Sequence, residues 1–438
     1  MSLSVIIALS VFSIALFLIV FEVMDKSIIA LSGALILLLT KVITFDQAIE
    51  SINFEIIFLL AGMMMLVDVT RASGFFSWLN VKITTISKGN PFLIFLLFCT
   101  LTFFISAFLD NVTTIIIMIP ITIELLRGMG KDPKPYVIAE IMLSNVGGAM
   151  TIIGDPTNVI IGTAAKLTFN QVIFNMAVPT LTVLVMILIA LYIVKWDQLK
   201  PITKDFQKLF LSNILIKKVQ YTFLSEHIDA KRIAKAVFVL VLTILGFIFQ
   251  NALGLPLAVI ALMGATLVVI ISIKDIQLHR VLESVEWATL FFFGGLFIMV
   301  GALEHLGVLE LIGTYLAGLD VSFLTLLIVI IWGAAIFSML LDNVALVTVM
   351  VPIILNMQTH LNGRQEHMDL LWWSLALGAI LGGNGTLIGA SANVVGSGVA
   401  KKHGLNITFT GFLKYSLPIT ILALMVSTVY ISIRYYFL

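Results

Sequence analysis

Residues Gly147–Asn158 read GGAMTIIGDPTN, and residues Gly382–Asn393 read GGNGTLIGASAN. Both runs are rich in glycine and polar residues, yet each lies inside long hydrophobic sequence. Each run also follows an Asp-Asn pair at a similar distance: Asp110-Asn111 in the first half of the chain and Asp342-Asn343 in the second. The same unit therefore occurs twice, and the rest of the sequence is organised around the two copies.

The composition is typical of a membrane protein. Of the 438 residues, 60% are hydrophobic and 11% are charged, whereas soluble globular chains carry about 25% charged residues. The mean hydropathy is +1.14, and apolar runs long enough to cross about 30 Å of hydrocarbon recur from end to end. We therefore expect an all-α polytopic membrane protein whose surroundings are the lipid bilayer. Nothing in the sequence indicates an enzyme or a partner nucleic acid, and no phosphate-binding P-loop is present.

Matching positions extend over the whole chain and define two repeats. We expect the first repeat at residues 1–194, with a hairpin at 92–126 and a broken helix at 137–165. The second is expected at 236–438, with a hairpin at 323–355 and a broken helix at 370–400. A basic cytoplasmic linker at 195–235 joins them. Internal symmetry of this kind is typical of two-repeat transporters. The matched pairs include Gly62 and Gly295, Pro120 and Pro352, Thr151 and Thr386, Gly154 and Gly389.

The topology follows from counting crossings. If each hairpin is re-entrant and each broken helix crosses once, each repeat crosses about five times, and an odd number makes the two repeats inverted. With both termini outside, 21 of the 25 Lys and Arg residues fall on the inner side, among them Lys26. This agrees with the positive-inside rule. We expect a multi-pass protein of a bacterial or archaeal type of inner membrane.

The two glycine runs predict helix breaks within the membrane. Irregular backbone survives there only where protein or a water-filled cavity covers it. A break exposes carbonyl groups that can hold a cation, and it leaves a helix N-terminus that favours an anion. Pro156 suits the start of the second half-helix. The alternative is that the glycines only allow close helix packing.

Asp110 and Asp342 each lie between two apolar arms. A carboxylate in the membrane costs about 2.5 to 3.5 kcal/mol on insertion scales, so it usually marks an ion path or a proton relay. A simpler role is also open, in which each Asp caps the helix that follows it. We expect Glu124, Glu140 and Asp68 to lie near span ends, solvated or paired.

The two halves differ in charge. Asp155 of the first half is replaced by Ala390 in the second, and Asn384 has no counterpart in the first. We expect the first half to bind the coupling cation or proton and the second to make mainly neutral contacts with the substrate. A Na⁺ ion would be held by Asp110, Asn111, Asp155, Asn158, Asp342 and Asn343, and no other cofactor is expected. The full set of expected binding residues is Asp110, Asn111, Thr113, Thr114, Gly148, Thr151, Gly154, Asp155, Thr157, Asn158, Asp342, Asn343, Gly383, Asn384, Thr386, Gly389, Ser391 and Asn393.

Four motifs resemble the P-protein branch of the ArsB/NhaD family, within the ion transporter superfamily. They are FLDNVTT at 108–114, IGDPTNVIIG at 153–162, VEWATLFFF at 285–293 and GGNGTLIGASANVV at 382–395. The resemblance covers nearly the whole chain. It implies a scaffold domain, a transport domain with two opposed hairpins and two broken helices, a homodimer, and elevator-like alternating access.

The same resemblance implies movement of inorganic ions: arsenite or antimonite outward, or sodium against protons. The related symporters carry Ser-Asn-Thr where this chain has its two Asp-Asn pairs, and the extra carboxylates favour coupling to H⁺ or Na⁺. We therefore expect a secondary active antiporter of small inorganic ions. The alternatives are a Na⁺-coupled di- or tricarboxylate (citrate-like) symporter and a passive anion channel on the same scaffold.

Overall fold

The structure is a computed structural model that describes residues 2–21, 23–87, 90–194, 229–273, 277–318, 321–361 and 367–437. Within these ranges the chain is helical and contains no strand. The helices of the first half are α1 (Leu3–Val20), α2 (Lys26–Leu39), α3 (Phe45–Ser51), α4 (Phe54–Ala72), α5 (Phe75–Ser87), α6 (Pro91–Ser106), α7 (Asn111–Gly128), α8 (Lys134–Gly148), α9 (Pro156–Ala164) and α10 (Phe169–Val194).

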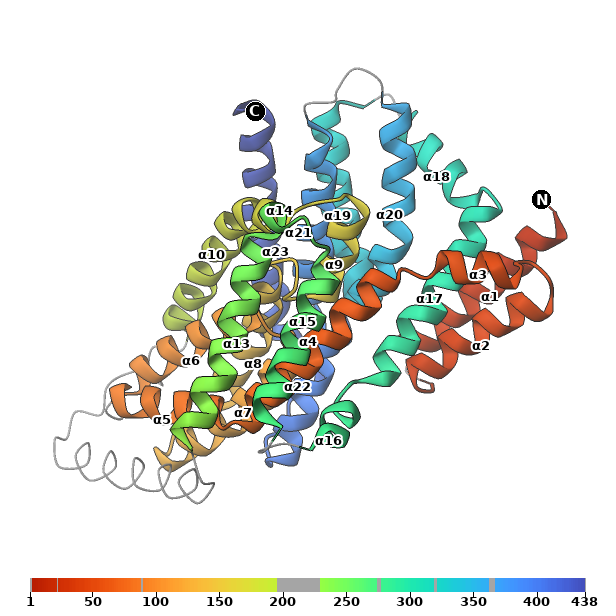
Figure 1. The fold of residues 1–438 in the computed structure, drawn as a ribbon. Helices are drawn as coiled ribbons and strands as arrows, with labels where there is room; N and C mark the ends of the chain where they lie inside the picture. The colour runs from red at the N-terminus through yellow and green to blue at the C-terminus, as the bar shows by residue number, and fades with distance from the viewer. Residues whose placement is uncertain are drawn as a thin grey trace.

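The second half repeats this order with one short helix, α14, inserted after its first helix, and Figure 1 shows both halves along the colour gradient. Its helices are α13 (Ala230–Ile248), α14 (Gln250–Leu253), α15 (Leu257–Ser272), α16 (Leu278–Glu283), α17 (Trp287–His305), α18 (Val308–Ala317), α19 (Phe323–Leu340), α20 (Asn343–His360), α21 (Asp369–Gly383), α22 (Ser391–Lys402) and α23 (Phe409–Phe437).

The expected helix breaks are confirmed. Helix α8 ends at Gly148 and α9 begins at Pro156, while α21 ends at Gly383 and α22 begins at Ser391. The hairpin arms are α6 with α7 and α19 with α20. Seven of the described helices are long and apolar enough to cross a membrane, or eight if the bent pair α3 and α4 is one span. Most of the expected basic linker, 195–228, lies outside the described residues.

The two repeats pack on each other reciprocally. Helix α17 of the second repeat lies on α2 of the first, and α15 of the second lies on α4 of the first (Figure 1). The sequences Ile29-Ala30-Leu31 in α2 and Ile260-Ala261-Leu262 in α15 are identical, which makes α2 and α15 counterparts, as α4 and α17 are. If each helix is replaced by its counterpart, the contact of α2 with α17 becomes the contact of α15 with α4. The two repeats are therefore related by a two-fold operation.

Glycine makes these two crossings close. A Cβ atom on Gly62 of α4 would lie 2.9 Å from the carbonyl carbon of Ala261, and a Cβ on Gly295 of α17 would lie 2.6 Å from that of Ala30. Such distances are shorter than any real contact of this kind, so only glycine lets the backbones approach this far. The matched positions in the sequence are therefore matched contacts in the fold.

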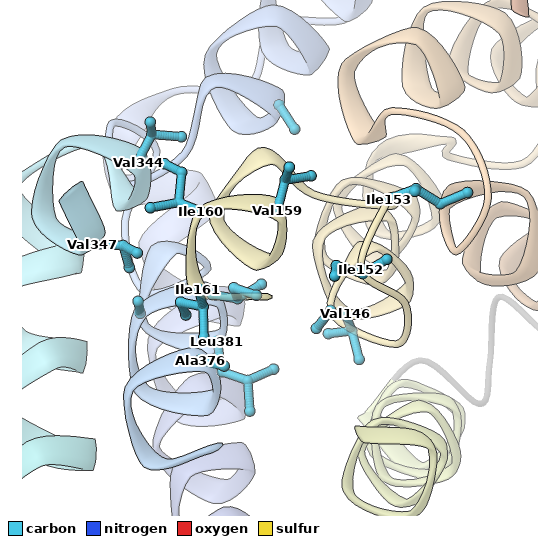
Figure 2. Close-up of a cluster of buried hydrophobic side chains, with 14 of the residues drawn as sticks. Val146, Ile152, Ile153, Val159, Ile160, Ile161, Val344, Val347, Ala376 and Leu381 are labelled. Carbon is cyan, nitrogen blue, oxygen red and sulfur yellow. The ribbon is translucent and has the colours of Figure 1, made fainter. Parts of the chain in front are cut away.

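The half-helices also exchange partners. Helix α9 of the first repeat packs on α20 and α21 of the second, and α22 packs on α7 and α8 of the first. Figure 2 shows the apolar side of this contact, where Ile160 of α9 lies beside Val344 and Val347 of α20, and Ile161 lies near Leu381 of α21. This exchange brings the starts of α7, α9, α20 and α22 together, and with them the polar residues of both repeats.

Candidate functional site

Each helix break is closed by an asparagine of the half-helix that follows it. Asn158 Nδ2 donates to the carbonyl oxygens of Ala149 at 2.9 Å and Thr151 at 2.8 Å. Asn393 Nδ2 donates to those of Gly383 and Thr386, both at 2.8 Å. An unpaired carbonyl is costly within a bilayer, so these amides stabilise the break. The amide nitrogens of Asn158 and Asn393 are therefore used structurally and do not face a ligand.

The threonines and glycines of the two motifs hold each break against a hairpin tip. Thr151 Oγ1 donates to the carbonyl oxygen of Ala107, and Thr386 Oγ1 donates to that of Met339 at 2.5 Å. A Cβ on Gly154 would lie 2.7 Å from the carbonyl oxygen of Ser106. These glycines therefore allow close packing and also form the breaks, so close packing is not their only role.

Both hairpin aspartates cap the helices that follow them. Asp110 Oδ2 accepts from the Thr113 N–H at 2.9 Å, and Asp342 Oδ1 accepts from the Val344 N–H at 3.0 Å. Each is only partly buried and lies on the wall of a cavity. Capping therefore occupies one oxygen of each carboxylate, and the second oxygen of Asp342 accepts from Lys26 and Ser391. Thr114 is different, because its hydroxyl is buried and donates to the backbone oxygen of Asp110 at 2.9 Å.

A network of buried amides joins the two repeats. Asn111 Nδ2 donates to Asn145 Oδ1 at 2.9 Å and to Asp155 Oδ2 at 3.1 Å. Asn145 Nδ2 in turn donates to Asn384 Oδ1 at 2.7 Å and to Asn393 Oδ1 at 2.8 Å. Charged or polar groups buried in this way stabilise a structure only when they are paired. Asn145 therefore connects the polar residues of the first repeat with those of the second.

Asp155 lies at the centre of this network and is 1% exposed. Its Oδ1 atom accepts from the Thr157 N–H at 2.8 Å, which caps α9, and its Oδ2 atom faces the amides of Asn111 and Asn343, the latter at 3.5 Å. Beside it, Thr157 Oγ1 is buried without a hydrogen-bond partner among the described residues. The backbone N–H of Thr157 and the side-chain amides of Asn111 and Asn343 therefore all point their N–H groups at this one carboxylate.

A cavity of about 590 Å³ opens onto this region. Its volume lies within the range of about 300 to 1,000 Å³ that small-molecule sites occupy. Seven of the expected binding residues line it: Asp110, Asn111, Thr113, Asp155, Asp342, Asn343 and Ser391. Six further residues with charged or hydroxyl side chains also line it: Lys26, Asp68, Arg71, Ser284, Glu286 and Thr289.

The remaining expected residues do not reach the cavity wall. They pack behind it, where they build the two breaks and the amide network: Thr114, Gly148, Thr151, Gly154, Thr157, Asn158, Gly383, Asn384, Thr386, Gly389 and Asn393. The six residues named for a Na⁺ ion therefore divide into three groups. Asp110 and Asp342 cap the second helices of the hairpins. Asn111, Asp155 and Asn343 converge, whereas the Asn158 amide is turned to the backbone.

The acidic groups of the cavity outnumber the basic ones. Lys26 pairs with Asp342 at 3.3 Å and Arg71 pairs with Asp68 at 2.7 Å. No basic side chain of the described chain lies within ion-pair distance of Asp110 or Asp155. Across the described ranges, no group of three or more His, Cys, Asp or Glu residues is placed to hold a metal ion. The cavity is therefore acidic, and the side-chain amides of Asn111 and Asn343 form part of its wall.

Sequence reasoning missed two residues and misplaced a third. Lys26 follows a span end, where charge is common, so only the fold reveals its partner. Asn145 follows Ser144 in the mainly apolar run Ile141–Val146, and its counterpart in the second repeat is Ile380, a difference that could have been noticed. Glu140 was expected near a span end, but it is fully buried and accepts from Thr122 Oγ1 at 2.6 Å.

Comparison with known proteins gives a family match and several relatives. A family model described as "Citrate transporter" matches residues 16–378. An uncharacterized transporter of Mycobacterium tuberculosis is 34% identical over 441 residues and 99% of both chains. The P protein of Mus musculus is 31% identical over 497 residues, which cover 95% of this chain and 59% of the P protein. The expected similarity to P proteins is thus confirmed.

Two solved structures share the fold. Neisseria gonorrhoeae MtrF, described with a class of antimetabolite efflux pumps, superposes with a TM-score of 0.59 at 14% identity, covering 91% of this chain and 83% of that one. The Alcanivorax borkumensis YdaH transporter, described as having an unusual topology, superposes with a TM-score of 0.55 at 14% identity. The superposition covers 90% of this chain and 88% of that one. At these identities the likeness concerns the fold alone.

Proposed function

Because the chain belongs to the citrate transporter family, we propose that it is a secondary active transporter whose coupling ion, H⁺ or Na⁺, binds at Asp155 and Asp110. In this proposal the chain exchanges small inorganic ions by antiport, as Na⁺/H⁺ exchange or as efflux of arsenite or antimonite. It lies in an inner membrane with both termini outside and acts as a homodimer. The motifs shared with the ArsB/NhaD family support the inorganic ion.

The observation that carries the proposal is a buried carboxylate without a basic partner. Among the described residues, the groups that face Asp155 are uncharged, and no basic side chain lies within ion-pair distance of it, so its negative charge is not neutralised. A carboxylate at membrane depth costs about 2.5 to 3.5 kcal/mol on insertion scales. Binding of a proton or a metal cation removes that cost. Asp155 is thus suited to take up a cation from the cavity and to release it again.

Two features support alternating access by movement of the hairpins and breaks. The binding residues lie at the starts of four helices, all within the paired hairpins and broken helices. The reciprocal crossings α2 with α17 and α4 with α15 form a second group of helices, which contains none of the hairpin arms or broken helices. In the proposed cycle the second group is the scaffold, and the first moves against it as one unit.

A second candidate is Na⁺-coupled uptake of a di- or tricarboxylate. It is favoured by the description of the matching family and by the two basic side chains, Lys26 and Arg71, on the cavity wall. Both are paired with carboxylates in this conformation, so a carboxylate substrate would have to displace them. A passive anion channel is the third candidate, and the acidic balance of the cavity speaks against it.

The test is ion flux in sealed proteoliposomes that contain a pH-sensitive dye. Na⁺, Li⁺, arsenite and citrate are added outside in turn. We expect a dye response to Na⁺ or arsenite, and we expect Asp155→Asn to reduce it at least tenfold because the amide cannot exchange a cation. Asp46→Asn, an exposed residue at the start of α3, is the matched control and should respond as the wild type does.

The other candidates predict different results in the same assay. Inward transport of citrate that requires Na⁺ would establish the symporter. Chloride current that follows the membrane potential, with no ion moved against its gradient, would establish a channel. A full response in Asp155→Asn would remove that residue from the coupling site.

A further inference from the structure

Lys26 lies where the second half-site would bind a cation. Its Nζ atom donates to Ser391 Oγ at 2.8 Å and to Asp342 Oδ2 at 3.3 Å, and Ser391 Oγ donates to the same carboxylate oxygen at 2.9 Å. The ammonium also lies 4.9 Å from the ring centre of Phe292, within the distance at which an aromatic face attracts a cation. Lys26 therefore has a complete set of ligands, supplied by three different helices.

The two repeats differ at this position. Alignment of Ile29-Ala30-Leu31 with Ile260-Ala261-Leu262 makes Leu257, at the start of α15, the counterpart of Lys26. Leucine carries no charge, and Asp110, the counterpart of Asp342, has no basic partner among the described residues. The negative charge of Asp342 is thus neutralised by Lys26 of the same chain. Asp110 remains available to an ion from solution.

The ion pair also joins the two helical groups. Lys26 is the first residue of α2, which packs on α17, whereas Asp342 caps α20 and Ser391 begins α22. The lysine side chain is 35% exposed and the aspartate 12%, so both face the cavity and can separate without unfolding. Any movement of the hairpins relative to α2 has to break these contacts.

We propose that Lys26 is a tethered cation that occupies the Asp342–Ser391 half-site and competes there with the transported cation. The proposal rests on the proposed function, in which mobile cations bind to the cavity carboxylates. In this conformation the mobile cation has one site, at Asp155 and Asp110. When the ammonium leaves Asp342, the carboxylate requires another cation, and the competition links domain movement to cation occupancy.

The test counts cations bound to purified full-length protein in detergent. Radiolabelled Na⁺ measures bound sodium, and the protons released or taken up are measured in weakly buffered solution with a pH dye. Lys26→Met removes the ammonium while keeping an unbranched side chain of similar length. We expect it to bind one more cation per chain than the wild type, as Na⁺ or H⁺. Lys26→Met combined with Asp342→Asn should lose the additional cation.

Controls separate this result from a general change in the protein. Lys26→Arg keeps the charge and should bind the wild-type number, and size-exclusion profiles show that each variant is folded. An equal total of Na⁺ and H⁺ in the wild type and in Lys26→Met overturns the proposal. If the wild type binds no cation but Lys26→Met binds one, the tethered cation stands and the proposed coupling site at Asp155 fails. The two ideas are therefore distinguishable.

Discussion

Asp155 and Asp342 are both acidic residues of the cavity, but their neighbours differ. Asp155 is surrounded by amide and backbone N–H donors, whereas Asp342 has a lysine and a serine hydroxyl. Amide dipoles stabilise a negative charge without neutralising it, and an ammonium neutralises it. At the scale of single residues, the structure therefore distinguishes a carboxylate without a basic partner among the described residues from one that is paired with a lysine, and the proposed mobile cation binds at the first.

Glu140 is a buried acid outside the cavity. It is fully buried, one oxygen accepts from Thr122, and the other has no partner among the described residues. The positions that correspond to these two residues in the second repeat are Leu375 and Ile354, so the pair occurs in only one repeat. The hydroxyl of Thr122 is the single direct support for this carboxyl.

Loss of that hydroxyl is expected to destabilise the fold. Thr122→Val leaves both oxygens of Glu140 unsatisfied in the core, which costs about 1–3 kcal/mol. We expect a lower unfolding temperature of the purified protein, measured by intrinsic tryptophan fluorescence on heating. Thr122→Ser keeps the hydroxyl and should remain close to the wild type. Equal melting of the Val and Ser variants would show that the hydrogen bond contributes nothing.

At the scale of elements, the fold is built from crossings that recur in each repeat. Gly295 lets α17 approach Ala30 of α2, and Gly62 lets α4 approach Ala261 of α15. Lipid tails are as apolar as leucine, so helices in a bilayer associate through close packing more than through exclusion of water. These two glycine contacts are therefore central to how the repeats hold together.

Neighbouring glycines of α17 provide a matched pair for a test. Gly295→Ala places a Cβ 2.6 Å from the Ala30 carbonyl carbon, whereas Gly294 has open space at the corresponding point. We expect Gly295→Ala to cost about 1–3 kcal/mol because the helices must move apart. Gly294→Ala should stabilise the helix by up to about 1 kcal/mol. Thermal melting in detergent compares them, and a similar loss in both variants would contradict the close crossing.

At the scale of the whole molecule, the proposed movement changes access to the cavity. Ser391 lies on the cavity wall at the start of α22. In a chain with Cys99→Ala, which removes its single cysteine, we expect labelling of Ser391→Cys by a membrane-impermeant thiol reagent to change at least threefold when Na⁺ is added. Asp46→Cys, on an exposed helix outside the cavity, should label at a constant rate. Constant labelling of both would argue against alternating access.

Much of the site could be predicted from the sequence because its motifs occur in both halves of the chain. The pairs Gly154 with Gly389 and Thr151 with Thr386 revealed the breaks, and glycine, proline and asparagine have strong local preferences that do not depend on distant contacts. The Asp-Asn pairs were informative because charge is rare in apolar sequence. Long apolar runs with few charges alone predicted the membrane class and the all-helical fold.

The roles of individual polar residues were decided only by the tertiary structure. The Lys26 ammonium meets Asp342 across 316 positions of sequence, and Asn145 meets Asn384 and Asn393 of the other repeat. Glu140 is buried because α7 and α8 close around it. Periodicity and composition describe one segment at a time. Which carboxylate is neutralised depends on side chains that only the packing of one repeat against the other brings within a few ångströms.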